Sequence, residues 1–459
     1  GVVLVFMVQC VFCTFYNPNG FNEPPRGTVD VFKSVEDNCY YLDMLLGTPP
    51  VTLRAIIDSE LEFSLFIDSK SCRNLHNSTM QCFDPSDSMT SEFTEDYIRN
   101  LCVIYKDLMG FDGIDFRTST RYCLAYYDVN ELGTMYNVDG YLGMGYLTYY
   151  TTEFNIWTNM IPIGWPKVIG LQLNGENGNS SMDIGGVSYG DEIIWSQKQT
   201  NILVEDPLFI EAALFHISLC GARLLPTTSF TPAQFVTSHN ILGLTDELYD
   251  IFMSLMEDTC ESVETDLIRG SIACIYDSIE EIDNLPSFTF SLSEEGSLFR
   301  IPLSKLITSQ VELPSVRDGG VELQYRITLG IVRSGSFSYH TSDKIIFGML
   351  PMELFYVAIN TDEHRIGLYQ NITINSNITD ANCPPIKTCI GDQSYIDATN
   401  QCQDPVCKFY QIVDDDTKTC TTSVLFIVLV SSVLILFSLA DCCTSEWRLR
   451  LEDKVPQEN

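Results

Sequence analysis

The chain has little positive charge, few histidines and few long helical periods. Lys and Arg number 26 against 61 Asp and Glu, which gives a formal charge of −35, and no basic patch gathers the cations. Such a field disfavours nucleic acid and anionic membrane surfaces as partners. The 5 histidines are scattered and show no ligand spacing, and the cysteine-rich region has no Cys-x2-Cys pair. The sequence therefore predicts no bound metal and no cofactor.

Hydrophobic and turn-forming residues alternate along most of the chain. With 459 residues and 45% hydrophobic content, it can bury a large core over two or more domains. From residue 38 to residue 370, short β-branched and aromatic runs are broken by Gly, Asn, Asp and Pro, which predicts an all-β body. A boundary between residues 201 and 206 divides this body into 38–205 and 206–370.

Cysteine is abundant, and its 17 residues are densest from Cys383 to Cys420. There a small repeat places Cys389-x12-Cys402 before Cys407-x12-Cys420. Residues 371–422 are too short for a core of their own and are expected to form a disulfide-held stalk in an oxidising compartment. The candidate disulfide cysteines are Cys72, Cys82, Cys260, Cys274, Cys389, Cys402, Cys407 and Cys420.

Both ends carry apolar segments. Residues 1–15 are similar to a signal peptide. Residues 423–440 hold no charge, and a helix of about 18 residues rises ~27 Å, so we expect a transmembrane helix in contact with the lipid bilayer and a cytoplasmic tail over 441–459. The expected product is a single-pass type I membrane protein of the secretory pathway, at the cell surface or in endolysosomes, with its body extracellular or lumenal. Four sequons are candidate glycosylation sites: Asn77, Asn179, Asn371 and Asn377.

An ordered set of short motifs runs through the body. Leu46-Gly47-Thr48-Pro49-Pro50 precedes Ile56-Ile57-Asp58-Ser59, and then follow Asp139-Gly140-Tyr141-Leu142-Gly143, Asp183-Ile184-Gly185-Gly186, Ile346-Phe347-Gly348 and Arg365-Ile366-Gly367. In this order and spacing the chain resembles the pepsin-family aspartic peptidases, with a membrane-anchored, β-secretase-like architecture. The resemblance implies a bilobal β fold, a cleft between the lobes, and one catalytic Asp from each lobe.

Two departures from that family concern the catalytic residues. Asp58 matches the first catalytic Asp, but Thr237 stands where the resemblance places the second one. The family reaction needs two carboxyl groups that share a proton, and a hydroxyl cannot replace one of them. Glu60 also replaces the glycine of the first motif, next to Ser59 in the expected substrate cleft. We interpret Glu60 as a solvated side chain, with an Asp58–Glu60 dyad as a minor alternative.

Tyr105 matches the tyrosine that precedes a substrate-covering hairpin in the family. Residues 106–109, Lys-Asp-Leu-Met, would then occupy the hairpin tip, where the family has small residues. Tyr105 is therefore either a cleft residue or a strand aromatic in the core.

Three functions stay open. The first is a catalytically inactive peptidase homologue, a pseudoenzyme whose cleft binds a peptide or protein. The second is an active membrane-bound aspartic endopeptidase that performs proteolysis, and the third is a structural surface glycoprotein.

Overall fold

The computed structural model describes residues 24–34, 39–61, 63–69, 81–98, 102–125, 138–145, 156–174, 178–197, 211–220, 222–224, 229–256, 260–263, 271–317, 320–336, 342–370, 389–396, 401–414 and 416–452. These residues are mostly β-strand with few helices, which confirms the all-β class. The chain divides into two compact units, Gly1–Pro384 and Pro385–Asn459. The expected signal segment 1–15 and the boundary expected between 201 and 206 lie outside the described residues.

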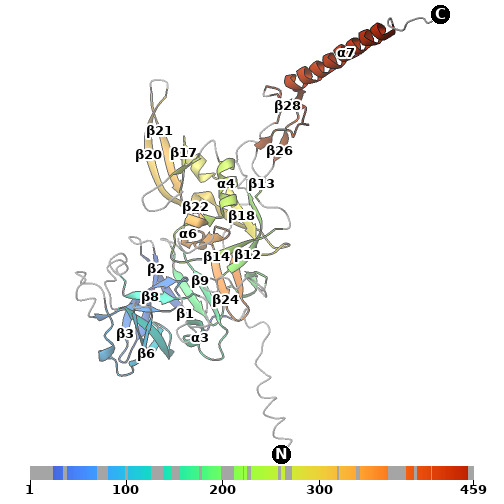
Figure 1. The fold of residues 1–459 in the computed structure, drawn as a ribbon. Helices are drawn as coiled ribbons and strands as arrows, with labels where there is room; N and C mark the ends of the chain where they lie inside the picture. The colour runs from blue at the N-terminus through green and yellow to red at the C-terminus, as the bar shows by residue number, and fades with distance from the viewer. Residues whose placement is uncertain are drawn as a thin grey trace, which may run out of the picture. The chain divides into compact units, whose positions relative to one another are not determined.

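The first unit contains a 13-stranded sheet with the order β11-β25-β24-β9-β10-β1-β2-β3-β8-β4-β7-β6-β5 (Figure 1). Its strands are β1 (Gly27–Ser34), β2 (Cys39–Leu46), β3 (Val51–Asp58), β4 (Leu65–Ile67), β5 (Glu92–Ile98), β6 (Cys102–Phe111), β7 (Arg117–Ala125), β8 (Gly140–Gly143), β9 (Val168–Gln172), β10 (Ser180–Ile184), β11 (Ile194–Trp195), β24 (Tyr356–Asn360) and β25 (Arg365–Tyr369). β24 and β25 come from the expected second lobe, yet β24 pairs antiparallel with β9 of the first. The two halves of the body thus share one sheet.

An 8-stranded sheet follows the order β19-β18-β12-β14-β23-β15-β22, with β13 paired to β12. Its strands are β12 (Glu211–Leu219), β13 (Ala222–Arg223), β14 (Thr231–Phe235), β15 (Leu242–Leu244), β18 (Ser287–Ser291), β19 (Phe299–Pro302), β22 (Ile331–Arg333) and β23 (Ile345–Phe347). A 4-stranded sheet joins β16 (Cys260–Val263), β17 (Ser271–Tyr276), β21 (Gly320–Leu329) and β20 (Ile307–Arg317). Both sheets belong to the 206–370 half of the chain.

Helices are short in this unit: α3 (Ile156–Asn159), α4 (Asp246–Leu255), α5 (Ile279–Asp283) and α6 (Met349–Met352). The longest, α4, begins where the Thr245 hydroxyl accepts a hydrogen bond from the Leu248 N–H and two acidic residues fill the first turn. Its buried face, which includes Tyr249 and Phe252, packs into the core.

The same pairing pattern surrounds β3 and β14. β3 runs parallel to β8, β8 antiparallel to β4, and β4 parallel to β7. β14 runs parallel to β23, β23 antiparallel to β15, and β15 parallel to β22. The strands that carry the first motif and its expected counterpart therefore end in matching surroundings.

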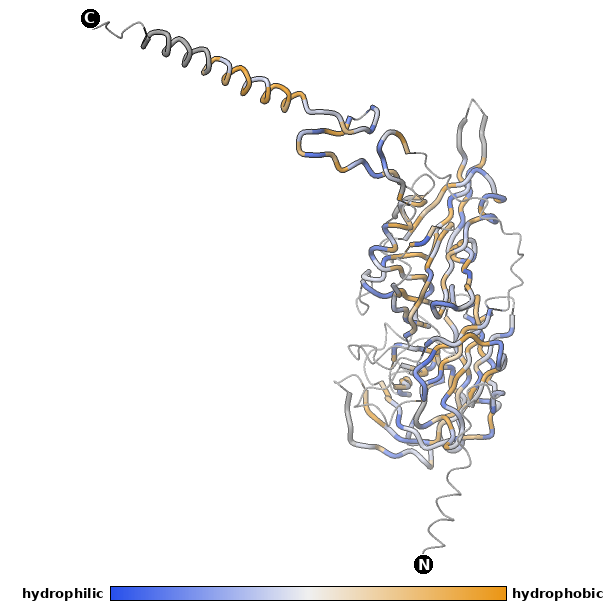
Figure 2. Tube along the Cα trace, turned by 90° about the vertical axis from the view of Figure 1, so that its right-hand side faces the viewer, coloured by the Kyte–Doolittle hydropathy of each residue, from blue (hydrophilic) through white to orange (hydrophobic). Residues whose placement is uncertain are grey.

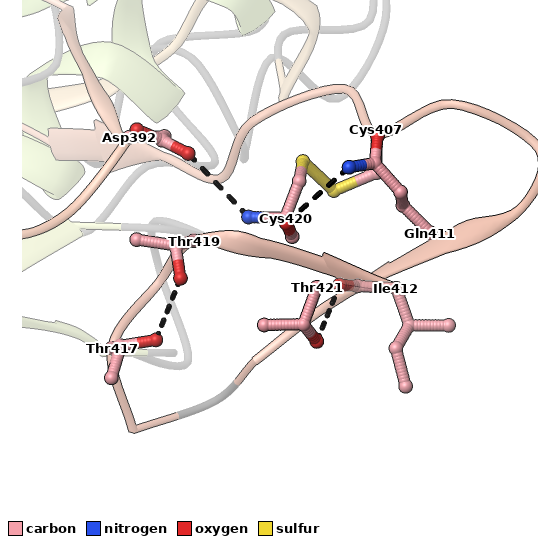
Figure 3. The surroundings of a disulfide bond; sticks show 8 residues. All are labelled: Asp392, Cys407, Gln411, Ile412, Thr417, Thr419, Cys420 and Thr421. Atoms are coloured by element: carbon pink, nitrogen blue, oxygen red, sulfur yellow. Dashed lines mark hydrogen bonds between the residues drawn. A yellow bond between two sulfur atoms is a disulfide. The ribbon is translucent and has the colours of Figure 1, made fainter. Parts of the chain in front are cut away.

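The second unit is built from two small hairpins and a helix. β26 (Ser394–Ile396) pairs with β27 (Gln401–Gln403), and β28 (Gln411–Val413) pairs with β29 (Cys420–Thr422). Disulfides Cys389–Cys402 and Cys407–Cys420 close one hairpin each, which confirms these four cysteines as disulfide-bonded and gives the pairing that the sequence left open. Figure 3 shows the second disulfide beside Asp392, whose carboxylate accepts a hydrogen bond from the Cys420 N–H. The Asp392 N–H in turn donates to the Lys418 carbonyl, so the two hairpins are joined.

The expected membrane segment is helical but is not found to span. Residues from Val424 onward belong to α7 (Val424–Glu452), and Figure 2 colours the first part of α7 largely apolar. Within the part of the chain that the structure describes, no helix has the length and apolarity needed to cross a membrane. This finding does not support the transmembrane helix predicted over residues 423–440.

Of the other four candidate disulfide cysteines, the structure describes three. Cys260 and Cys274, both candidates, form a disulfide with each other between β16 and β17. Cys82 is disulfide-bonded, while Cys72 lies outside the described residues. A disulfide that the sequence did not suggest joins Cys102 on β6 to Cys123 on the neighbouring β7.

Candidate functional site

Asp58 is the last residue of β3, and the chain bends directly after it. Its Oδ1 accepts hydrogen bonds from the backbone N–H groups of Glu60 at 2.8 Å and Leu61 at 3.2 Å. Its Oδ2 has no hydrogen-bond partner among the described residues. Burial raises the pKa of Asp58 to about 6, against the two backbone hydrogen bonds and with a smaller contribution from the Glu60 charge. Asp58 therefore holds a proton well above the pH at which an exposed aspartate loses it.

Ser59 and Thr237 connect the end of β3 to the end of β14. The Ser59 N–H donates to the Thr237 hydroxyl, and the Thr237 N–H donates to the Ser59 hydroxyl, each at 3.0 Å. Each hydroxyl then donates to a carbonyl across the junction, Thr237 to Ile57 at 2.7 Å and Ser59 to Phe235 at 3.1 Å. Both residues are buried, and we call these four bonds the Ser59–Thr237 lock.

Because Ser59 and Thr237 donate to each other in the same way, the lock shows which residues at the ends of β3 and β14 occupy equivalent positions. Thr237 is the counterpart of Ser59, and Val236 is then the counterpart of Asp58. The strand register agrees, because Asp58 pairs with Gly143 while Phe235 pairs with Phe347, which sets Val236 beside Gly348. A Cβ on either glycine would lie within 2.5 Å of backbone oxygen atoms, so both positions need glycine for the same reason. If the chain shares the fold of the family that it resembles, the position of the second acid would therefore fall on Val236 and not on Thr237.

Glu60 is not the solvated side chain that the sequence suggested. Its carboxylate accepts a hydrogen bond from the Ser238 hydroxyl and lies 3.6 Å from Nε2 of His239. The Glu60 side chain is only 19% exposed. The residue therefore reaches from the first motif to the segment after β14 and adds a second connection beside the lock.

Tyr105 lies in the middle of β6, which forms a hairpin with β7, and the turn of this hairpin falls at residues 112–116. β6 continues without interruption to Phe111, so residues 106–109 form strand and not a hairpin tip. The Tyr105 ring is half-buried between Phe93 at 5.6 Å and Tyr122 at 6.2 Å and packs against the core. The structure thus selects the alternative of a strand aromatic, because bulky residues at 106–109 continue a strand more readily than they form a tight turn.

Two other motif aspartates hold the fold together. Asp139 accepts hydrogen bonds from the backbone N–H groups of Arg54 and Gln81, and burial raises its pKa. Asp183 accepts from the hydroxyls of Thr28 and Tyr356, and also from Ser188. Their side chains are satisfied within the protein, which makes both of them structural.

Of the sequons, the structure describes one asparagine, Asn179, which is exposed. Asn77, Asn371 and Asn377 lie outside the described residues. Glycosylation of Asn179 stays a prediction.

At the β3–β14 junction, Asp58 supplies a carboxyl group, whereas its counterpart Val236 supplies none. Protonated below pH 6, Asp58 is able to donate a hydrogen bond through Oδ2, and above that pH it only accepts. Opposite it, Val236 is fully buried and offers neither donor nor acceptor. Such a site can bind a polar group, but within the part of the chain that the structure describes no second carboxyl group is hydrogen-bonded to Asp58 to share a proton.

Sequence reasoning missed Val236, Ser238 and His239. Their signal was present, since Phe235-Val236-Thr237-Ser238 repeats the apolar-x-hydroxyl order of Ile57-Asp58-Ser59-Glu60. No family model matches the chain, and no curated protein matches it.

Proposed function

We propose that this chain is a catalytically inactive homologue of the pepsin-family aspartic peptidases, bilobal in architecture, that binds a peptide or protein segment where β3 and β14 meet. The observation that carries the proposal is Val236 at the position equivalent to Asp58. The Ser59–Thr237 lock supports it further, because the junction is maintained although one acid is absent.

The chemistry favours binding over hydrolysis. Two carboxyl groups close together are forced to share one proton, which makes one the base and the other the acid. Asp58 has no such partner, and removal of one member of a catalytic unit costs on the order of 10⁴ in rate. A peptide in an extended conformation offers carbonyl and N–H groups that Asp58 Oδ2 can bind in either protonation state.

Restoring the second acid tests this proposal. The double variant Val236→Asp with Glu60→Gly should hydrolyse unfolded protein at pH 3 to 6, on the order of 10³-fold faster than the unaltered chain. The matched control is Thr237→Asp with Glu60→Gly, which keeps the same charge but breaks the lock and should show no hydrolysis. Equal activity of both variants would contradict the assignment of Val236.

The unaltered chain distinguishes the alternatives. Hydrolysis that is lost in Asp58→Ala would establish an active endopeptidase and refute the proposal. Failure of the unaltered chain and of its Val236→Asp, Glu60→Gly variant to bind immobilised unfolded peptides would instead favour a structural surface glycoprotein.

We also propose that residues 423–440 associate with a lipid bilayer, with the body on the extracellular or lumenal side of the secretory pathway. Apolar side chains exposed from Val424 to Leu439 and disulfides in both units support this. The full chain should stay with the membrane pellet after alkaline extraction, whereas a chain that ends at Thr422 should be released. Release of both would refute it.

A further inference from the structure

A cavity of about 170 Å³ lies far along the chain from Asp58, on one face of the 13-stranded sheet. Gln172 of β9 pairs with Tyr356 of β24, which pairs with Tyr369 of β25, so the three residues form one row across neighbouring strands. Figure 1 shows β9 and β24 in the same part of the fold. The remaining lining comes from Asn174, Tyr189 and the segment Glu353-Leu354-Phe355.

The aromatic wall of this cavity is rigid. Tyr189 stacks on Tyr369 with ring centroids 4.1 Å apart and meets Tyr356 edge-on at 4.9 Å. The Tyr356 hydroxyl is fixed by a 2.7 Å hydrogen bond to the buried Asp183. These rings offer flat apolar surface at little cost in conformational entropy.

The lining also contains polar side chains. Glu353 Oε1 accepts hydrogen bonds from Lys33 at 2.8 Å and Tyr40 at 2.7 Å, which leaves Oε2 without a partner among the described residues. The Glu353 side chain is 18% exposed. Gln172 and Asn174 add two amide groups, bonded to each other at 3.3 Å. A fixed carboxylate oxygen, two amides and aromatic rings suit a ligand with an apolar ring face and several hydroxyl groups.

A sequon lies on the hairpin that supplies this lining. Asn174 lines the cavity, and its Nδ2 donates to the backbone carbonyl of Asn179 at 2.6 Å. Gly178 lies close to Asn174, because a Cβ on Gly178 would lie 2.5 Å from the Asn174 Cβ. Asn179 itself is exposed and is followed by Ser180-Ser181, so it is an acceptor for an N-linked glycan beside the cavity.

We propose that this cavity binds one pyranose ring of an N-linked glycan, with the ring against the tyrosine wall and its hydroxyls donating to Glu353 Oε2. At about 170 Å³ the cavity is smaller than the ~300–1,000 Å³ of pockets for drug-sized ligands, which fits a single sugar ring. The sugar comes either from the glycan on Asn179 or from another glycoprotein, and its recognition chemistry is the same.

Saturation-transfer NMR with N-acetylglucosamine tests the site in the full chain. The Asn179→Gln variant, which carries no sugar at this position, should show transfer to the free sugar. Adding Leu354→Trp, which fills the cavity from its wall, should abolish the transfer, and adding Glu353→Gln should weaken binding about tenfold through loss of a charged acceptor. A matched control is Glu295→Gln, which changes an exposed carboxylate elsewhere and should leave binding unchanged.

The two sources of the sugar give different results in the glycosylated chain. If the Asn179 glycan occupies the cavity, free sugar binds the Asn179→Gln variant but not the glycosylated chain. If the sugar is external, both bind it equally. Absence of transfer in the Asn179→Gln variant, or transfer that survives Leu354→Trp with the thermal transition intact, would overturn the proposal.

Discussion

Ser59 and Thr237 each place a hydroxyl where it accepts one buried N–H and donates to one buried carbonyl. Four backbone groups at the β3–β14 junction are satisfied in this way by two side chains. Buried polar groups that lose such partners are costly. The residue next to Thr237, Val236, has no polar atom in its side chain, so substitution there leaves the four bonds in place.

Replacement of Thr237 should separate this structural role from catalysis. Thr237→Val leaves the Ser59 N–H and the Ile57 carbonyl unpaired and should lower the free energy of unfolding by about 2–4 kcal/mol. Thr237→Ser keeps the hydroxyl and should cost much less. Urea unfolding of both variants measures the difference, and equal losses would show that the hydroxyl contributes nothing.

The raised pKa of Asp58 predicts a pH dependence. The folded pKa of about 6 exceeds the ordinary value of 3.8, so the folded state keeps a proton that the unfolded chain releases, and stability falls as pH rises from 4 through 6. Asp58→Asn removes this loss while its amide oxygen still accepts from Glu60 and Leu61. The variant should match the parent near pH 4 and be more stable at pH 7, by at most about 3 kcal/mol.

Thermal unfolding at both pH values measures this effect. Glu295→Gln, at an exposed carboxylate, is the control and should show no such pH trend. A stability difference for Asp58→Asn that is equal at pH 4 and pH 7 would contradict the prediction.

At the scale of elements, the sequence predicted those features that depend on local spacing or on the alternation of apolar residues. The cysteines of the two x12 repeats are disulfide-bonded as expected, and each pair closes one short hairpin. The Cys102–Cys123 disulfide was not predictable, since it depends on the pairing of β6 with β7 and not on local spacing. That Thr237 is the counterpart of Ser59 was not evident from the sequence, because flanking hydrophobic residues do not fix a register that hydrogen bonds across two sheets determine.

The junction of the two stalk hairpins gives a prediction at this scale. Gly391 has φ +59, and a Cβ there would lie 2.1 Å from the Thr417 carbonyl oxygen. Gly391→Ala should therefore force the hairpins apart and break the bond from the Asp392 N–H to Lys418, while both disulfides stay closed.

Hydrogen exchange provides the measurement. The amides of Asp392 and Cys420 should exchange at least tenfold faster in Gly391→Ala, whereas the neighbouring change Ile390→Ala, at an exposed side chain, should leave them unchanged. Unaltered exchange in Gly391→Ala would show that the hairpins are not held through this contact.

For the whole molecule, the sequence predicted the β class from composition but not the sharing of one sheet by both halves. β9, at residues 168–172, is completed on one side by β24, which the chain reaches almost two hundred residues later. Two strands so far apart in the sequence share no local sequence pattern, so their pairing could not be predicted from the sequence. The two halves therefore depend on each other for stability.

A truncation measures this dependence. A fragment of residues 24–205 lacks β24 and leaves the backbone and the buried side chains of Ile169 and Leu171 open at the sheet edge, so it should aggregate or unfold without a cooperative transition. The control fragment 24–384 keeps all strands of the first unit and should unfold cooperatively. A folded, soluble 24–205 fragment would contradict the prediction.

The place of Val236 beside an undisturbed lock has a genetic consequence. A glutamate codon becomes a glycine codon by one change at its middle base, and so does a valine codon GTT or GTC that becomes an aspartate codon, whereas GTA and GTG need a second change. Two or three point mutations therefore separate this gene from an aspartate at position 236 and a glycine at position 60, and selection on the gene would show in whether those codons are conserved.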